Sequence, residues 1–348
     1  MIWPLPICSS SIRNREPSMS EKEQPLLSLC MIVKDEEQWL EACLQSVHQT
    51  VDEMIVVDTG SKDATADIAL RYGAKVYHHY WKNDFAEARN RALELAKGRW
   101  ILHLDADEQW DSAAANGLPG ILSATDADGI LVQVRNWHPR DDMVRYLDSP
   151  QVRLFRNLPT FRYEGRVHEQ IAPSIQRHSG KIQNSDLLIH HYGYQQNNRS
   201  KARRNLTILE EQARKHPEDL FTRYKLAETC KALGENERAR NIFKEIADNE
   251  INKLNSDMAE NLYMRLAQLE LAENHFENTI RYAEKSFGMN RENVLSEYLL
   301  SIACIYTGQS ERAMNHLQHI LQEDRQDVID RQDVEKLISV CRHTMEDL

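Results

Sequence analysis

The sequence predicts an α/β domain with a mostly parallel sheet and helices on both faces, followed by an all-α domain of helical repeats. Strand-like and helix-like segments alternate up to about residue 112, and the pattern is helical from about residue 201. The chain has 348 residues, which at roughly 150 residues per domain fits two domains. Its 12 glycines and 10 prolines are few, which favours helices over an all-β fold.

We expect three segments along the chain. Residues 1–24 are interpreted as a disordered N-terminal extension, since a second methionine, Met19, opens a segment typical of an N-terminus. Residues 25–198 are expected to form the α/β domain, and residues 199–348 the helical domain. The first residues lack a basic n-region and carry two prolines in a short apolar stretch, so they make a poor signal peptide.

Composition limits the classes of partner. The formal net charge of −11 gives no general attraction to nucleic acid or to anionic lipid, so a phosphate must be bound locally, by a metal or a few donors. The six cysteines form no CxxC pair and are interpreted as buried, reduced thiols. No apolar run approaches the ~20 residues of a membrane helix. We therefore predict a cytoplasmic protein with no integral membrane segment.

Apolar runs of strand length recur in the first half of the chain, and the first of them, residues 27–33, is typical of a strand buried on both faces. The first four of them cover residues 27–33, 54–57, 75–77 and 100–104. Helices are expected between them, from Asp35 through Val47, up to Tyr72, and from Asn83 or Asp84 to a stop at Gly98. Later strands are predicted over residues 129–135, 151–155 and 187–194, the last running into a loop.

Acidic residues follow two of these strands. Asp58 ends the second strand, and Asp105 and Asp107 come directly after the fourth. Parallel α/β sheets bind ligands at the carboxyl ends of their strands, and two carboxylates in one pocket are costly without a cation. Mg²⁺ or Mn²⁺ takes oxygen ligands and bridges to substrate phosphates, so we predict a cation and diphosphate site; a solvated loop is the alternative. A second Asp-Ala-Asp copy at residues 126–128 precedes a strand and is interpreted as a turn.

Small residues recur in the second half at steps of 40 and 34 residues. The clearest copies keep the same offsets, Ala227, Cys230, Gly234, Ala239 and Phe243 against Ser301, Cys304, Gly308, Ala313 and Leu317. A weaker copy comprises Ala267, Glu270, Asn274, Thr279 and Ala283. Such a period lets helix pairs pack closely and stack, which resembles degenerate tetratricopeptide repeats; a generic helical bundle is the alternative.

Three sequence blocks carry a family resemblance. The segments SLCMIVKDEEQWLEACLQSV, MIVVDTGSKDAT and DFAEARNRALELAKGRWILHLDADE together resemble glycosyltransferase family 2, with its GT-A type nucleotide-sugar domain, over roughly residues 26–112. The later RLFRN, RYEGRVHEQ and HHYGY segments, with helical repeats behind them, resemble the branch that carries C-terminal tetratricopeptide repeats. Some members of that branch glycosylate peptides, including bacteriocin S-glycosyltransferases.

The resemblance implies donor-binding residues. Backbone groups around Val33 would hold the nucleotide base, and Asp58 would contact the base or ribose. Many relatives have two aspartates where this chain has Asp58-Thr59, and a loop cap is the alternative role for Asp58. Arg89 and Asn90 lie on the helix before the fourth strand; Arg89 would reach the diphosphate or else be an exposed helical arginine.

The resemblance also implies a metal site. Asp105 would meet the ribose or the metal, and Asp107 would ligate the metal. A late histidine often completes the metal shell, and His191 fits that position best. His190 is its rival, because strand alternation sends the two rings to opposite faces.

The resemblance also implies a catalytic residue, because in the GT-A pattern a glycine-containing loop precedes an acidic residue that acts as base. Gly165 followed by Glu169 fits that order, so Glu169 is predicted to be the catalytic base. His168 is the alternative base, or a packed residue, and a salt bridge with Arg166 is the structural alternative for Glu169.

Together these residues predict an inverting, metal-dependent glycosyltransferase that uses a nucleotide sugar, with a UDP-sugar favoured. A protein or peptide acceptor is preferred because the repeats offer a groove for one; a cell-envelope glycan or lipid-linked acceptor is the alternative. Two alternatives belong to other functional classes: a catalytically inactive repeat-based binding protein and a nucleotidyltransferase. Nucleic acid is not expected as a partner, and a homo-oligomer is left open.

Overall fold

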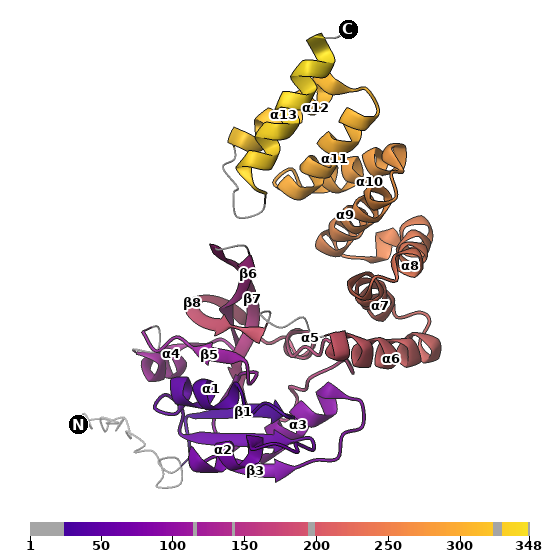
Figure 1. Cartoon of the computed structure of the whole chain (residues 1–348). Coiled ribbons are helices and arrows are strands. Elements are labelled where there is room, and N and C mark those ends of the chain that lie inside the picture. Colours follow the sequence, from indigo (N-terminus) through magenta and orange to yellow (C-terminus); the bar gives the residue numbers. More distant parts are fainter. Residues whose placement is uncertain (1–23, 114–116, 141–142, 194–198, 323–328, 347–348) are drawn as a thin grey trace, which may run out of the picture. The chain divides into compact units, whose positions relative to one another are not determined.

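The computed structural model describes residues 24–113, 117–140, 143–193, 199–322 and 329–346. It divides into two compact units (Figure 1). The first consists of the chain up to Asn136 together with Asp148–Gly193, and the second of Trp137–Leu147 together with the chain after Gly193. The predicted N-terminal extension lies, except for Gln24, outside the described residues, and so do residues 194–198 at the predicted domain boundary.

The first unit is built on a mixed sheet. Its strands are β1 (Leu27–Val33), β2 (Glu53–Asp58), β3 (Lys75–His78), β4 (Trp100–His103), β5 (Glu108–Trp110), β6 (Gly129–Arg140), β7 (Met143–Arg156) and β8 (Ile182–His191). Their order is β3-β2-β1-β4-β7-β6-β8-β5. The four strands β3, β2, β1 and β4 are parallel, as predicted. The rest is mixed, because β7 runs antiparallel to β4 and β5 antiparallel to β8.

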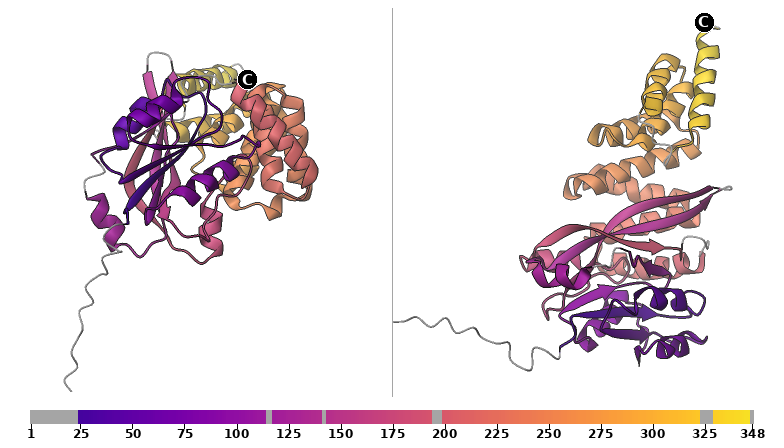
Figure 2. Two further views of the ribbon diagram at one scale, coloured as in Figure 1. Left: turned by 90° about the horizontal axis from the view of Figure 1, so that it is seen from below. Right: turned by 90° about the vertical axis from the view of Figure 1, so that its left-hand side faces the viewer.

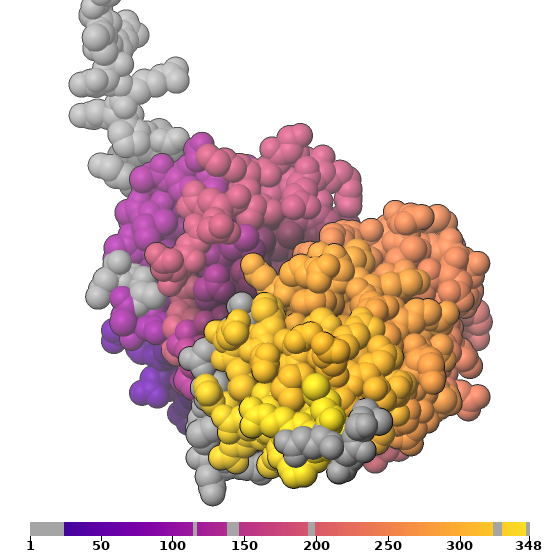
Figure 3. Space-filling model, turned by 90° about the horizontal axis from the view of Figure 1, so that it is seen from above, coloured from indigo at the N-terminus to yellow at the C-terminus, as the bar shows by residue number. Residues whose placement is uncertain are grey.

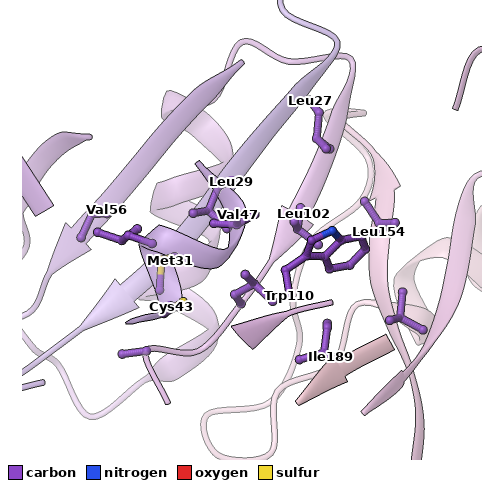
Figure 4. Close-up of a cluster of buried hydrophobic side chains, with 14 of the residues drawn as sticks. Leu27, Leu29, Met31, Cys43, Val47, Val56, Leu102, Trp110, Leu154 and Ile189 are labelled. Atoms are coloured by element: carbon purple, nitrogen blue, oxygen red, sulfur yellow. The ribbon is translucent and has the colours of Figure 1, made fainter. Parts of the chain in front are cut away.

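Helices pack on both faces of this sheet. They are α1 (Leu40–Val47), α2 (Thr65–Arg71), α3 (Phe85–Leu95), α4 (Leu118–Ala124) and α5 (Ala172–Arg177). Successive strand residues point to opposite faces. Leu29 and Met31 of β1 accordingly pack in one buried cluster with Val47 of α1 (Figure 4), whereas Cys30 packs in the other with Ala92 of α3. This confirms the predicted α/β fold with helices on both faces.

The helix expected from Asp35 begins later, at Leu40. Asp35 has a left-handed backbone (φ 53°) that no helix continues. Its carboxylate accepts a hydrogen bond from the Lys62 amide (2.7 Å), and its own amide donates to Ser61 Oγ (3.0 Å). The acidic side chain therefore joins the loops after β1 and β2, and the prediction that it leads the helix was wrong.

The helix before β4 begins as predicted but ends early. Asp84 caps α3 by accepting a hydrogen bond from the Glu87 amide (2.9 Å). Gly98 lies beyond the end of α3. A Cβ there would lie 2.6 Å from the Ser28 amide nitrogen, so the position requires glycine for the close approach of two backbones.

A buried carboxylate joins β1, β2 and β3. Glu53 accepts hydrogen bonds from Ser28 Oγ (2.7 Å), the Lys97 amide (2.8 Å) and Lys75 Nζ (2.7 Å). Burial raises the pKa of Glu53, but these donors outweigh it and the pKa is lowered. Its ionised form is therefore bound more strongly in the folded state than in the unfolded state.

We expect Glu53→Gln to lower the free energy of unfolding by about 1–3 kcal/mol at neutral pH, because buried donors lose a charged acceptor. The contribution of Glu53 is complete above its unfolded pKa and is lost as pH falls through the lowered folded pKa, so the difference should shrink in acid. Urea unfolding at several pH values measures this. Glu94→Gln, at an exposed site where the carboxylate pairs with Arg91, is the control.

The second unit is dominated by helices that follow one another along the chain (Figure 2). They are α6 (Arg199–Lys215), α7 (Leu220–Leu233), α8 (Asn236–Asn249), α9 (Ser256–Ala272), α10 (Phe276–Met289), α11 (Val294–Tyr306), α12 (Ser310–Gln322) and α13 (Arg331–Glu346). The last of them are orange and yellow in Figure 3. None of the helices in the described ranges is both long and apolar enough to span a membrane.

The predicted repeat positions are structurally equivalent. Gly234, Asn274 and Gly308 each have a left-handed backbone, with φ of 85°, 59° and 74°. Each forms the turn between the two helices of a pair, where glycine or asparagine is favoured. The small residues that were aligned within the helices are fully buried: Ala227, Ala267, Ser301, Ala239, Thr279 and Ala313. The helical-repeat prediction is thus confirmed at the level of individual residues.

Candidate active site

Two of the predicted metal ligands lie together after β4 and at the end of β8. Antiparallel pairing places Glu108 of β5 opposite His191 of β8, which brings the preceding Asp107 beside the same histidine. Asp107 Oδ2 lies 3.5 Å from His191 Nε2. His190, on the other face, lies 3.3 Å from Asp111 instead. Strand alternation therefore selects His191 over His190 as the partner of Asp107.

The tautomer of His191 follows from its second nitrogen. His191 Nδ1 lies 2.8 Å from Asn136 Oδ1, an amide oxygen that only accepts, so Nδ1 carries a proton. Nε2 then faces the Asp107 carboxylate, and the pair requires a proton or a cation between them. Burial lowers the pKa of His191, but the hydrogen bond and charge of Asp107 outweigh it and raise the pKa.

Glycine at position 193 makes room for this pair. A Cβ at Gly193 would overlap Asp107 Oδ2 and would lie 2.9 Å from His191 Nε2. The backbone of Gly193 therefore lies against one side of a candidate metal site. Its ligand atoms are one carboxylate oxygen of Asp107 and one imidazole nitrogen of His191. Within the described ranges, no three His, Cys, Asp or Glu side chains gather as a complete metal site. Two protein ligands nevertheless suit Mn²⁺ or Mg²⁺, which complete their coordination with water and phosphate oxygens.

Gly193→Ala is expected to lower metal-dependent turnover of donor about 10- to 100-fold, because the added methyl displaces the Asp107 carboxylate by a fraction of an ångström or more. The melting temperature should change little, since the residue is not in the core. Steady-state kinetics with varied Mn²⁺ measure the effect. Gly120→Ala, where nothing lies within 4 Å of the new methyl, is the matched control and should behave as the parent.

Asp105 points toward buried arginines. Its Oδ1 accepts a hydrogen bond from Arg89 Nη2 (2.8 Å), and its Oδ2 lies 3.5 Å from Arg153 Nη2. Burial raises the pKa of Asp105, but Arg89, His103 and Arg153 outweigh it and hold the pKa well below the usual range. The structure thus pairs Asp107 with His191 and pairs Asp105 with arginines; a role of Asp105 toward ribose or metal stays a prediction.

A buried polar network supports the loop that carries both aspartates. Arg153 of β7 donates to Glu108 Oε1 (2.5 Å), and Glu108 Oε2 accepts from the Asp105 amide (2.8 Å). His103 Nε2 lies 3.3 Å from Asp105, and its Nδ1 lies 2.9 Å from the Tyr163 hydroxyl. Burial and the two arginines lower the pKa of His103 to about 3, so the ring is neutral. Burial and Asp105 raise the pKa of Glu108 to about 7 against the opposing charge of Arg153.

Four further residues belong to the site although the sequence did not identify them: Arg153, His103, Glu108 and Tyr163. His103 follows three apolar residues in β4, and Arg153 has an apolar neighbour on each side in β7; both side chains are buried. A charged residue between apolar neighbours in a predicted strand requires a buried partner if that strand is covered. That signal was present in the QVRLF segment, but it did not identify the partner.

Glu169, the predicted base, lies in the same region. Arg89 Nε donates to Glu169 Oε1 (2.5 Å), so one guanidinium joins Glu169 and Asp105. Arg89 is therefore buried, and the alternative of an exposed helical arginine is wrong. The loop is closed by a bridge between Glu164 and Gln170 and has left-handed backbone at Gly165 (φ 97°). His168 in this loop is exposed.

The remaining predicted donor residues have structural partners. Asn90 clamps Tyr163 by accepting from its amide (2.8 Å) and donating to its carbonyl (3.0 Å). The Val33 carbonyl accepts from the Thr59 amide (2.9 Å). Asp58 Oδ1 accepts from the Ser61 amide and hydroxyl, as in the loop-cap alternative, and Oδ2 lies 3.3 Å from the exposed His78. Their contacts with a nucleotide stay predictions.

Comparisons with known proteins agree with this architecture. The model of the family described as Glycosyl transferase family 2 matches residues 28–204. A TPR repeat-containing protein of Synechococcus elongatus is 37% identical over 228 residues, which cover 63% of this chain and 56% of that protein. The SPbeta prophage-derived glycosyltransferase SunS of Bacillus subtilis is 28% identical over 245 residues, which cover 69% of this chain and 57% of SunS.

The chain thus spans little more than half the length of these two curated relatives. A crystal structure of TarS from S. aureus is also similar, with 15% identity, a TM-score of 0.43, and coverage of 73% of this chain and 54% of that one. The family model matches just over half of the chain, and the sheet and its helices are those of a GT-A-like domain. The chain therefore belongs to glycosyl transferase family 2, a family of glycosyltransferases, and carries tetratricopeptide-like helices after its glycosyltransferase domain.

Proposed function

We propose that the chain transfers a sugar from a UDP-sugar to a protein or peptide with inversion at the anomeric carbon, using a divalent cation. The observation that carries this proposal is the pairing of Asp107 Oδ2 and His191 Nε2 beside Gly193. Asp107 lies after β4, which is parallel to β1 and β2 and ends at the edge where such sheets bind ligands, and His191 lies at the end of β8. Asp107 and His191 would hold Mn²⁺ or Mg²⁺, and Asp105 would face the ribose.

When bound, the cation supplies charge neutralisation for the leaving nucleoside diphosphate. The chain's own residues fix the position of the loop that carries Asp105 and Asp107. The Glu108 carboxylate holds the Asp105 amide, and Arg153 holds Glu108, so the loop that carries both aspartates is fixed before substrate binds. Such preorganised groups cost no reorganisation during the reaction.

Glu169 is proposed as the general base. Its carboxylate is 11% exposed and is oriented by Arg89. In the reaction it accepts the proton of an acceptor hydroxyl or thiol. The oxygen or sulfur so freed forms a bond to the anomeric carbon as the bond to the diphosphate oxygen breaks, and UDP leaves with that electron pair. The neighbouring His168 is the second candidate for this proton.

A polypeptide acceptor is proposed because of the second unit. Stacked helix pairs form extended surfaces that suit a polypeptide chain, and the sequence resembles a branch of the family with peptide-glycosylating members. We also propose that the protein works in the cytoplasm. The cysteines of the described residues, Cys30, Cys43, Cys230, Cys304 and Cys341, are buried and unpaired, as in a reducing compartment.

A panel of UDP- and other nucleotide sugars, incubated with Mn²⁺ and the full chain, tests the function. Release of free nucleoside diphosphate from one donor, lost on addition of chelator, is the expected result. Glu169→Gln should lower transfer to an acceptor about 10²-fold or more while UDP binding is kept. Glu164→Gln, in the same loop but paired at the surface with Arg177, is the matched control. No release from any donor, or full activity of Glu169→Gln, would overturn the respective assignment.

A further inference from the structure

The second unit carries positive charge on one face of its first helix pairs. Ala227 of α7 and Ala267 of α9 are equivalent, fully buried repeat positions. Two residues before each of them stands a cation, Lys225 on α7 and Arg265 on α9. One turn after Ala227 stands another, Lys231. Lys225 and Lys231 each stand three residues from Glu228 on α7, and Arg265 Nε lies 3.7 Å from the Glu228 carboxylate, so the three cations surround one position of the helix surface.

This cationic face, formed by Lys225, Lys231 and Arg265, contains one carboxylate. Glu228 Oε2 accepts from Lys225 Nζ (2.8 Å), and Glu228 Oε1 lies 3.7 Å from Arg265 Nε. The Lys231 ammonium group has no hydrogen bond or ion pair with any residue in the part of the chain that the structure describes. Among the described residues, Glu228 is thus the carboxylate paired with this group of three cations, through Lys225 and Arg265.

The environment of the Lys231 side chain disfavours its charged form. Its side chain is partly buried, and burial together with the positive charge of Arg265 lowers the pKa of Lys231, against the attraction of Glu228. A lysine free to move into water would avoid both costs. An anion placed between Lys231 and Arg265 would remove them by forming charge-assisted hydrogen bonds with both side chains.

The surroundings suit a polypeptide ligand. Lys225 Nζ lies over the rings of Phe221 (5.7 Å) and Tyr224 (5.5 Å), so this end of the face is aromatic. Arg265 donates to the side-chain oxygen of Gln268 (3.3 Å), which adds an amide. Three cations beside a carboxylate, on a chain of net charge −11, are too few to follow a nucleic-acid backbone.

We propose that the cationic face of α7 and α9 binds an acidic segment of the acceptor polypeptide, with an aspartate or glutamate carboxylate between Lys231 and Arg265. This rests on the proposed function, because it assigns the chemistry of the acceptor. Acceptors are then selected for carboxylates in addition to the residue that is glycosylated.

Fluorescence anisotropy with the full chain tests the assignment. The probes are a labelled peptide of alternating glutamate and serine, its glutamine counterpart, and a labelled single-stranded oligonucleotide. The acidic peptide should bind, with an affinity that falls as salt is raised. The double change Lys231→Gln and Arg265→Gln should weaken it about tenfold or more. Lys231→Arg, which keeps the charge, should bind as the parent does.

Lys285→Gln is the matched control. Lys285 also lies over an aromatic ring, that of Tyr263 (4.9 Å), but on α10. It should leave peptide affinity unchanged. Equal binding of the acidic and glutamine peptides, equal loss in the control, or tighter binding of the oligonucleotide at this face would overturn the proposal. Donor hydrolysis by the same variants distinguishes failure of this proposal from failure of the proposed function. If only the peptide-binding proposal is wrong, the parent chain still hydrolyses the donor; if the proposed function is wrong, the parent chain does not hydrolyse it.

Discussion

Asp107→Asn should reduce sugar transfer roughly a thousandfold, because the amide offers a neutral oxygen where the cation requires an anionic one. Asp107 Oδ2 faces His191 Nε2, and the backbone of Gly193 leaves the carboxylate little freedom. The main-chain carbonyl of Asp107 accepts from the Tyr192 amide (3.0 Å), a bond that the variant keeps. The loss should therefore appear in activity at saturating donor and Mn²⁺, with an unchanged melting temperature.

The chain provides its own control for this change. Residues 126–128 repeat the Asp-Ala-Asp sequence, but there Asp126 is exposed and pairs with Lys181 Nζ (2.9 Å). The Asp128 carboxylate accepts from the Lys181 amide (3.0 Å), as befits the predicted turn. Asp126→Asn should keep full transfer activity. Similar losses in both variants, or full metal-dependent activity of Asp107→Asn, would contradict the site.

Arg89→Met should lower the free energy of unfolding by about 3 kcal/mol, near the lower end of the effect of breaking a buried ion pair. Arg89 is 8% exposed and binds both Asp105 and Glu169. Asp105 retains Arg153 in the variant, so most of the cost falls on Glu169, whose side chain is only 11% exposed. Urea unfolding followed by circular dichroism measures the difference.

A neighbouring arginine serves as the comparison. Arg91 lies two residues along α3, is exposed, and pairs with Glu94 at 2.9 Å. Arg91→Met should change the free energy of unfolding by at most about 0.5 kcal/mol, as for an exposed helical pair. If the two variants unfolded at the same urea concentration, the buried bridge would have no stabilising role.

Periodicity and local chemistry predicted much of this molecule. The parallel strands β1 to β4 follow from apolar runs separated by helical segments, and the equivalence of Gly234, Asn274 and Gly308 follows from their spacing. The family resemblance favoured His191 as the partner of Asp107, whereas alternation along the strand predicts only that His190 and His191 lie on opposite faces.

Long-range pairing explains what the sequence did not reveal. Asp35 forms hydrogen bonds with Ser61 and Lys62 on another loop, so its local pattern indicated a helix start that tertiary contacts override. Arg153 meets Glu108 across 45 residues, and Arg89 meets Glu169 across 80. These contacts depend on strand register and on the antiparallel pairing of β7 with β4, and neither can be predicted from a single segment of sequence.

Calorimetric titration of the full chain with UDP, with and without Mn²⁺, tests most directly whether Asp107 and His191 form a cation-dependent nucleotide site. UDP is expected to bind measurably only when Mn²⁺ is present, and His191→Ala should lose that binding while His190→Ala keeps it. UDP binding of equal strength without Mn²⁺, or no binding in either condition, would contradict the site.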